Sequence, residues 1–212
     1  MSAQSPSSLA KALSDRVIIA THNEGKLNEF KDLLRPYTSK IVSAGQLGLP
    51  SPEETGVTFA ENAILKAKAA SLATGSVALA DDSGLCVTAL NDQPGIYSAR
   101  WAEPGKDFNN AMQRVQDELG DATDRSAYFI CVLALYWPDG HSECIEGRIY
   151  GTLATAPRGK LGHGYDPIFI PRGETRTFAE MSDQEKNAIS HRSIATKELV
   201  EKFFAPTSRG VI

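Results

Sequence analysis

Residues 17–34 have the sequence VIIATHNEGKLNEFKDLL, in which the pattern of a strand changes within a few positions to that of a helix. The run VIIA is apolar and rich in β-branched residues, as in a buried strand. The polar THN that follows offers side-chain oxygens, and we expect Asn23 to cap a helix whose apolar residues recur at helical spacing until Pro36. This succession of strand, polar turn and helix is typical of an α/β fold.

A second helix and two further strands are predicted downstream. Residues 58–61, TFAE, match a capping box, and the helix that they open is expected to end at Gly75. The run VALA at residues 77–80 predicts a buried strand, DDSG at residues 81–84 predicts a turn, and residues 85–90 predict the next strand. The acidic pair of this turn is therefore expected at a strand end.

The second half of the chain predicts a hairpin between helices. A helix over residues 107–119 precedes the longest apolar run, residues 127–137, which we interpret as a central strand that turns back at residues 138–140. Residues 159–164 form a glycine-rich loop, and a capping box at residues 182–185 opens the closing helical region. Together these elements favour a mixed α/β sheet with two lobes around a cleft.

We expect one two-lobed domain over residues 16–205, with short tails at residues 1–15 and 206–212. The first tail is rich in Ser and Ala and lacks a long apolar run, so we interpret it as a flexible tail rather than a signal peptide. Nowhere does a segment approach the ~20 consecutive apolar residues that span a bilayer. A soluble protein is expected.

Composition and charge exclude several classes of protein. The 212 residues are 42% hydrophobic and 23% charged, which is ordinary for a globular chain and excludes disorder and fibrous repeats. The formal net charge of -4 offers no basic field for DNA or RNA, although a pocket for one nucleotide stays open. An odd set of cysteines without CxxC spacing (Cys86, Cys131 and Cys144) favours a reducing cytoplasm and makes a zinc site a poor fit.

The polar turn THNEGK at residues 21–26 is the first candidate site. Free backbone N–H groups at a helix start favour an anion, Gly25 allows close approach, and Lys26 adds a positive charge for a phosphate. The alternative is a plain capped helix with an exposed lysine. The turn is not a Walker A loop, because GxxxxGK[ST] is absent.

Two acidic pairs form the second candidate: Glu53 with Glu54, and Asp81 with Asp82. Carboxylate oxygens suit Mg²⁺, which takes one or two of them from the protein while phosphate and water complete its octahedron. Adjacent carboxylates repel one another unless a cation lies between them or one is protonated. The alternative for Asp81 and Asp82 is a polar turn without a ligand.

Three further groups could contact a nucleotide. Lys66 lies on the helix that begins near Phe59, where the alternative is a solvated helix face. In residues 163–166, HGYD, an imidazole or a phenol can stack on a base and Asp166 can accept from a base edge, whereas the alternative is a structural turn. A basic set near the closing helix could bind phosphate or base oxygens, or be an exposed helix end: Lys186, His191 and Arg192.

Taken in order, six motifs resemble the RdgB-like family of inosine and xanthosine triphosphate pyrophosphatases, from residue 17 to residue 203. The motifs are THNEGK, EETGVTFAENAILKAKAA, ALADDSGL, PGIYSARW, GHGYDPIF and QEKNAISHRS. The resemblance implies a house-cleaning enzyme that hydrolyses non-canonical purine nucleoside triphosphates (dITP, ITP and XTP) to the monophosphate and pyrophosphate with Mg²⁺. It also implies an elongated mixed β-sheet flanked by helices, with two lobes around a central nucleotide-binding cleft, and a cytoplasmic homodimer.

The resemblance also implies a role for each matching residue. Asp82 would be the general base and a metal ligand, with Glu54 and Asp81 as the other metal positions. Water bound to Mg²⁺ would attack the α-phosphorus, and Lys26 and Lys66 would offset the charge of the leaving pyrophosphate. The residues expected to bind the substrate are Thr21, His22, Asn23, Glu24, Gly25, Lys26, Lys66, Ser83, His163, Gly164, Tyr165, Asp166, Lys186, His191 and Arg192.

Two departures from the family pattern concern the base preference. His22 stands where many relatives have a small residue, and His163 stands where many have a stacking Phe. Arg192 or His191 would donate to the 6-oxo group of hypoxanthine or xanthine, whereas the 6-amino group of adenine would leave such a donor unpaired. Two alternatives stay open: a Maf-like nucleotide pyrophosphatase, whose S-x-S-x-x-R pattern is missing, and a nucleotide sensor without catalysis, against which the intact Lys26 and acidic residues argue.

Overall fold

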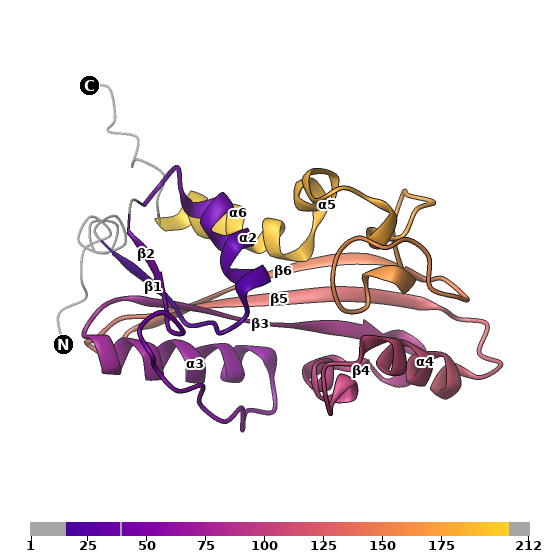
Figure 1. Ribbon diagram of the computed structural model, residues 1–212, viewed down its shortest axis with the longest axis horizontal. Coiled ribbons are helices and arrows are strands. Elements are labelled where there is room, and N and C mark those ends of the chain that lie inside the picture. The colour runs from indigo at the N-terminus through magenta and orange to yellow at the C-terminus, as the bar shows by residue number, and fades with distance from the viewer. Residues whose placement is uncertain (1–15, 39, 204–212) are drawn as a thin grey trace. The chain divides into compact units, whose positions relative to one another are not determined.

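Seven strands form one mixed sheet in the computed structural model, which describes residues 16–38 and 40–203 (Figure 1). The strands are β1 (Val17–Ile19), β2 (Ile41–Ser43), β3 (Ala78–Val87), β4 (Gln93–Pro94), β5 (Ser126–Tyr136), β6 (Ser142–Leu153) and β7 (Phe169–Pro171). Their order is β2-β1-β3-β5-β6-β7, with β4 on β3. Strand β1 is parallel to both β2 and β3, whereas β4 is antiparallel to β3 and β7 to β6.

Helices flank this sheet, which confirms the predicted mixed α/β fold (Figure 1). They are α2 (Glu24–Leu34), α3 (Phe59–Thr74), α4 (Phe108–Leu119), α5 (Asp183–Ile189) and α6 (His191–Phe203). Short 3₁₀ turns lie at Thr88–Leu90, Gly95–Tyr97, Arg100–Ala102, Asp166–Ile168 and Phe178–Glu180. The predicted tails at residues 1–15 and 206–212 lie outside the described residues.

The helix starts follow the local sequence closely. Asn23 caps α2 as predicted, its Oδ1 accepting from Lys26 N at 3.2 Å, and Gly75 ends α3 with a φ of 63°. Thr58 caps α3 by accepting from Glu61 N at 3.1 Å, but the predicted reciprocal bond is absent there: the Glu61 carboxylate accepts from Val57 N at 2.7 Å. The Glu61 carboxylate therefore binds the amide one residue before the N-cap instead of the amide of Thr58 itself.

The predicted turn at residues 81–84 is wrong, because the chain continues through it as the single strand β3. The polar side chains that suggested a turn have tertiary partners: Asp81 lies against Lys26, and Ser83 against Arg192. Such contacts outweigh a local turn preference. The acidic pair consequently lies in the middle of a strand, and Asp81 comes two residues after Leu79, the last residue of β3 that pairs with β1.

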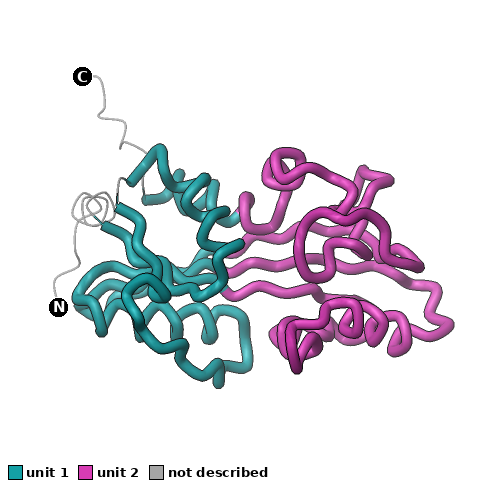
Figure 2. The backbone as a smooth tube through the Cα atoms, in the orientation of Figure 1, with its two compact units in different colours: residues 1–81, 133–145, 195–212 teal, residues 82–132, 146–194 magenta. Residues whose placement is uncertain are grey.

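The described residues divide into two compact units (Figure 2). Unit 1 falls within residues 1–81, 133–145 and 195–212, and unit 2 within residues 82–132 and 146–194. In unit 1, Figure 1 shows α3 on one side of the strands and α2 and α6 on the other. Residues 17–19 of β1 have no exposed surface, and small buried alanines of α3 let that helix pack closely against them.

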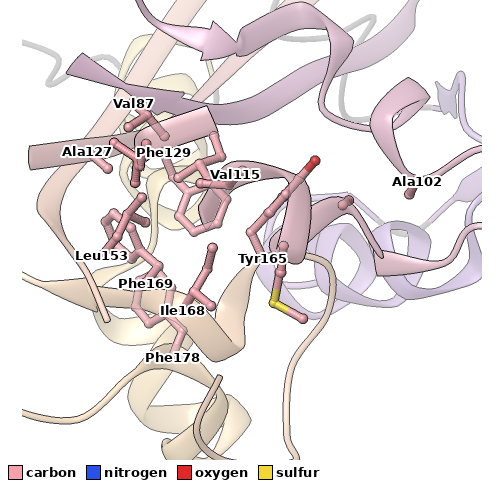
Figure 3. Packing of buried hydrophobic residues seen from close by; sticks show 14 of the residues in the cluster. Val87, Ala102, Val115, Ala127, Phe129, Leu153, Tyr165, Ile168, Phe169 and Phe178 are labelled. Carbon is pink, nitrogen blue, oxygen red and sulfur yellow. The ribbon is translucent and has the colours of Figure 1, made fainter. Parts of the chain in front are cut away.

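Unit 2 has an aromatic core beneath its loops (Figure 3). The Phe129 and Phe169 rings lie 4.7 Å apart between centroids, and Phe178 lies 5.3 Å from Phe169. Helix α4 contributes Val115 and its buried neighbours to the same cluster. This packing forms a firm base for the segment that contains residues 163–166.

All three cysteines lie on strands, and none is in a disulfide. Burial, the largest cause, raises the pKa of the Cys86 thiol to about 11, so this thiol is protonated at neutral pH. Within residues 16–38 and 40–203, no helix has the length and apolar character needed to cross a membrane.

Candidate active site

The loop after β1 presents the first group of predicted residues in unit 1. Thr21 is buried, and its Oγ1 accepts from Asn23 N at 3.1 Å, while Asn23 caps the helix in turn. Glu24 and Gly25 form the start of α2, where backbone N–H groups have no partner within the helix. The loop is therefore built by its own side chains, with its N–H groups at a helix start as the sequence predicts.

Lys26 reaches from this loop to β3. Its Nζ lies 2.7 Å from Asp81 Oδ2, and the Asp81 side chain is only 2% exposed, against 26% for Lys26. The lysine thus compensates a carboxylate that would be costly to bury alone. The structure brings together two residues from separate motifs, and Lys26 is a paired residue rather than the exposed lysine of the alternative interpretation.

Glu54 and Lys66 form a second pair in the same unit. Lys66 Nζ donates to Glu54 Oε1 at 2.6 Å, with the lysine side chain 11% exposed and the carboxylate 32% exposed. The interpretation of Lys66 as part of a solvated helix face is therefore wrong. Its partner lies in the loop before α3, which spacing along a helix could not indicate. Glu53, the other acidic residue of this loop, is exposed.

The loop that carries Glu54 is held by a residue that the sequence analysis missed. Asn62, which has no exposed surface, accepts from Gly56 N at 2.8 Å through Oδ1. A Cβ at Gly56 would lie 2.7 Å from that oxygen, so a glycine is needed for this approach. A polar residue on the buried face of a helix, beside Ala63 and Ala67, is the signal that could have identified Asn62.

His22 makes a contact that was not predicted. Its Nε2 lies 2.7 Å from the Leu49 carbonyl oxygen, within a pocket whose walls also include Lys66 and small residues of α3. Because a carbonyl only accepts, Nε2 carries the proton and donates. The imidazole therefore joins the loop of residues 21–26 to the segment that leads to Glu54.

A second group of predicted residues lies in unit 2. Asp82 and Arg192 are each 7% exposed and His191 is 6% exposed, so the alternative of an exposed basic helix end is wrong. The Arg192 guanidinium lies 3.4 Å from Ser83 Oγ. The His191 ring stacks on Phe129, with centroids 4.9 Å apart and planes 13° from parallel. Core packing therefore orients His191.

Asp166 and Lys186 form a buried pair in this unit. Their side chains are 3% and 9% exposed, and Lys186 Nζ lies 2.5 Å from Asp166 Oδ2. The same oxygen accepts from His163 N at 2.6 Å. Asp166 therefore stabilises the loop in which it lies, a structural role in addition to the predicted contact with a base edge. His163 itself is exposed, and Gly164 is half-buried with a φ of 66°.

Tyr165 is built into the core beneath this loop. Its side chain is 3% exposed, its hydroxyl donates to the Ser98 carbonyl at 2.9 Å, and its ring meets Phe108 edge-on at 5.4 Å. Burial raises the pKa of Tyr165 above its ordinary value, so the phenol is neutral and donates. The structure uses this phenol as an anchor for the loop.

The carboxylate oxygens of the predicted site residues are suitable ligands for a hard cation that takes only one or two ligands from the protein. Among residues 16–38 and 40–203 no group of three or more His, Cys, Asp or Glu side chains gathers as a metal site. Mg²⁺ needs only one or two protein carboxylates when phosphate and water complete its shell, so a single carboxylate, such as Glu54 of unit 1 or Asp82 of unit 2, has the chemistry that it requires. Because side chains alternate along a strand, Asp81 and Asp82 point to opposite faces of β3, and Asp81 is the one held by Lys26.

Known proteins resemble this chain along almost all of its length. The Ham1 family model matches residues 17–202. A protein of Gluconobacter oxydans named dITP/XTP pyrophosphatase is 54% identical over 180 residues, which are 85% of this chain and 86% of that protein. One of the same name from Rhodospirillum centenum is 55% identical over 194 residues, 90% of this chain and 96% of that protein.

Solved structures share the fold. A HAM1 protein from Coxiella burnetii superposes with a TM-score of 0.83 at 43% identity, covering 88% of this chain and 97% of that one. A nucleoside-triphosphatase, also named dITP/XTP pyrophosphatase, from Mycobacterium abscessus gives a TM-score of 0.72 at 39% identity, covering 87% and 98%. The similarity therefore extends over most of this chain and nearly all of the matched chains.

Proposed function

This chain belongs to the Ham1 family, as its motifs predicted, and on that premise we propose that it hydrolyses dITP, ITP and XTP to the nucleoside monophosphate and pyrophosphate. One observation carries the proposal: residues from three separate motifs meet in two lysine–carboxylate pairs, Lys26 with Asp81 and Lys66 with Glu54. The relatives that are 54% and 55% identical are named for this chemistry. Such enzymes would keep non-canonical purines out of DNA and RNA.

The two lysines would bind the triphosphate. Each is held in place by a carboxylate before substrate arrives, so little conformational entropy is lost when it binds a phosphate oxygen. The N–H groups at the start of α2 add a favourable site for an anion. Lys26 and Lys66 would then offset the charge that develops on the leaving pyrophosphate.

The family resemblance, rather than a contact between them, makes Glu54 and Asp82 the carboxylates that would serve as Mg²⁺ ligands. The ion, when bound, would neutralise phosphate charge and lower the pKa of a water molecule. Asp81, the third predicted ligand, has its Oδ2 on Lys26, and we assign to it the task of setting the position of that lysine. Asp81 on one face of β3 would therefore position Lys26, and Asp82 on the other face would bind the metal ion.

Asp82 would act as the general base. Its side chain lies on a central strand and the residue is 7% exposed, so its position is set by the sheet rather than by a mobile loop. It would take the proton of the water that attacks the α-phosphorus. A positioned base of this kind contributes roughly 10²–10⁴ to a rate.

Residues of unit 2 would recognise the purine. Lys186, His191 and Arg192 are donors held by buried contacts, and a 6-oxo group can accept from such donors. The 6-amino group of adenine would leave a buried donor without a partner, which costs about 1–3 kcal/mol, or roughly fivefold to more than a hundredfold in selectivity. The exposed imidazole of His163 would stack on the base.

A homodimer in the cytoplasm completes the proposal, as the family resemblance implies. The formal charge of -4 supports a nucleotide, rather than a nucleic acid, as the partner. Gel filtration with light scattering would test the dimer directly.

Pyrophosphate release from dITP, ITP, XTP, GTP and ATP, each with Mg²⁺ and with EDTA, tests the proposal. We expect Mg²⁺-dependent turnover of dITP, ITP and XTP, with kcat/KM for GTP and ATP lower by about tenfold or more. Orthophosphate as the product, or equal turnover of all purines, would contradict it. Turnover restricted to pyrimidine or modified nucleotides would favour the Maf-like alternative, and binding without turnover would favour the sensor.

A further inference from the structure

The segment that carries Glu54 is held firmly at the end next to α3. Lys66 contacts the Glu54 carboxylate at 2.6 Å, and two residues further on the Asn62 side chain accepts from Gly56 N at 2.8 Å. The Glu61 carboxylate accepts from the next amide, Val57 N, at 2.7 Å. Three side chains of one helix therefore hold residues 54–57.

The other end of the segment is held by a side chain from outside this helix. His22 Nε2 donates to the Leu49 carbonyl oxygen at 2.7 Å, five residues before Glu54. The Leu49 amide in turn donates to the Ala44 carbonyl at 3.0 Å, and the Ala44 amide donates to Ile19 of β1 at 2.9 Å. This end of the segment is thereby linked to the central sheet twice, through Ala44 and through His22.

His22 itself is well placed to act as a fixed anchor. It lies between Thr21, which is buried, and Asn23, which caps α2, so its backbone is set by the junction of β1 and α2. Its ring lies over Gly45, where an added Cβ would come within 3.7 Å of His22 Cδ2. The imidazole therefore lies beside Gly45 and has the Leu49 carbonyl as the acceptor for its Nε2.

We propose that His22 is a positioning residue that sets the place of Glu54 by holding the Leu49 carbonyl. The proposal rests on the proposed function, in which Glu54 is a ligand of Mg²⁺. Without the imidazole, the Leu49 carbonyl would lose this side-chain donor, and Glu54 would sample more conformations before it binds an ion. Ordering those conformations would then weaken metal affinity. The His22 side chain would position the metal ligand Glu54, while the backbone N–H groups of residues 21–26 would bind the phosphates.

Hydrogen exchange, measured by mass spectrometry without metal or nucleotide, tests the structural part. His22→Ala should raise the exchange rates of the Leu49, Gly56 and Val57 amides about fivefold, the effect expected from losing one exposed hydrogen bond. His22→Gln should stay near wild type, because a carboxamide can donate to the same carbonyl. His141→Ala is the matched control, since His141 lies at the β5–β6 turn and contacts Glu143.

Titration with Mg²⁺ tests the link to Glu54. Calorimetry on the apo protein should show weaker Mg²⁺ binding for His22→Ala, by about fivefold, with His22→Gln and His141→Ala close to wild type. In turnover of XTP, His22→Ala should need about fivefold more Mg²⁺ to reach its half-maximal rate. At saturating Mg²⁺ its KM for XTP should equal that of the wild type.

Two results would overturn the proposal. Unchanged exchange and unchanged Mg²⁺ affinity in His22→Ala would show that the contact does not hold the segment. A raised KM for XTP at every Mg²⁺ concentration, with exchange unchanged, would make His22 a direct phosphate ligand instead. If the wild type released no pyrophosphate at all, the proposed function would fail, while exchange and calorimetry would still decide whether His22 positions Glu54.

Discussion

Lys26 Nζ lies 2.7 Å from Asp81 Oδ2, so a lysine in the first turn of α2 neutralises a carboxylate in the middle of β3. The carboxylate is almost fully buried and the lysine is one-quarter exposed. Such a pair orients the lysine more than it stabilises the fold, because burying both charges costs nearly as much as their attraction returns. Removing either partner alone is the damaging change.

A double-mutant cycle should reveal this coupling. Lys26→Met and Asp81→Asn should each lower the free energy of unfolding by about 1–3 kcal/mol, since each takes the opposite charge away from the remaining partner. The double variant should lose less than the sum, with a coupling of about 0.5–3 kcal/mol. Urea unfolding of the four proteins measures all terms. Additive losses would mean that the pair is incidental.

Asp82→Asn should separate catalysis from folding. The amide keeps the size of the side chain but cannot take a proton from water, so kcat for XTP should fall by roughly 10²–10⁴. Circular dichroism should show an unchanged secondary structure. Asp121→Asn, which alters an exposed aspartate after α4, is the control and should keep wild-type turnover. A near wild-type kcat in Asp82→Asn would disprove its role as general base.

Lys186→Met should destabilise unit 2 through the carboxylate that it leaves behind. Asp166 would then be a buried charge without its cation, and the expected loss in unfolding free energy is about 3–5 kcal/mol. The variant with both Lys186→Met and Asp166→Asn should recover part of this loss, because an amide can still accept from His163 N without burying a charge. Urea unfolding of both variants makes the comparison. Equal stability of wild type and Lys186→Met, with a raised KM for XTP, would mean that Lys186 serves only the base.

The stability that the Glu185 carboxylate contributes at the N-terminal cap of α5 should depend on pH. The Ser182 amide, followed by Arg176, lowers the pKa of Glu185 from 4.5 to about 2. Because the folded pKa is the lower one, the ionised carboxylate stabilises the fold above pH 4.5, and this contribution is lost as the pH falls toward 2. Glu185→Gln should therefore be less stable than wild type at pH 7, with the difference shrinking across that window.

Urea unfolding at several pH values measures this difference. In 1 M NaCl the part due to the exposed Arg176 contact should shrink, whereas the part due to the Ser182 amide should persist. A difference between Glu185→Gln and wild type that stayed constant from pH 7 to pH 2 would contradict the assignment.

Local features of the fold were predictable because they depend on residues only a few positions apart. The caps at Asn23 and Ser182 and the glycine that ends α3 follow from single side chains at helix ends. The hairpin after residue 136 follows from its Pro-Asp-Gly turn between apolar runs. The family was likewise predictable, since six motifs in order leave few alternatives.

Contacts between distant segments were not predictable in the same way. Residues 81–84 have the composition of a turn, and only Lys26 and Arg192, brought from elsewhere in the chain, let them continue as a strand. The same limit applies to Lys66, whose acidic partner lies outside its helix. The local preference is worth a few tenths of a kcal/mol to about 1 kcal/mol, which is less than the cost of about 3–5 kcal/mol for burying a charge away from its partner.

The sequence by itself determined the α/β class, the starts of α2, α3 and α5, the family and the residues proposed to bind a nucleotide, but not the break at Ser190 between α5 and α6. Only the tertiary structure decided how those residues are used: which carboxylate holds a lysine, which tyrosine is an anchor in the core, and which histidine reaches the Leu49 carbonyl. The reason is physical. Capping and periodicity act over a single helical turn, whereas the burial and pairing of a charge depend on neighbours that folding alone brings within reach.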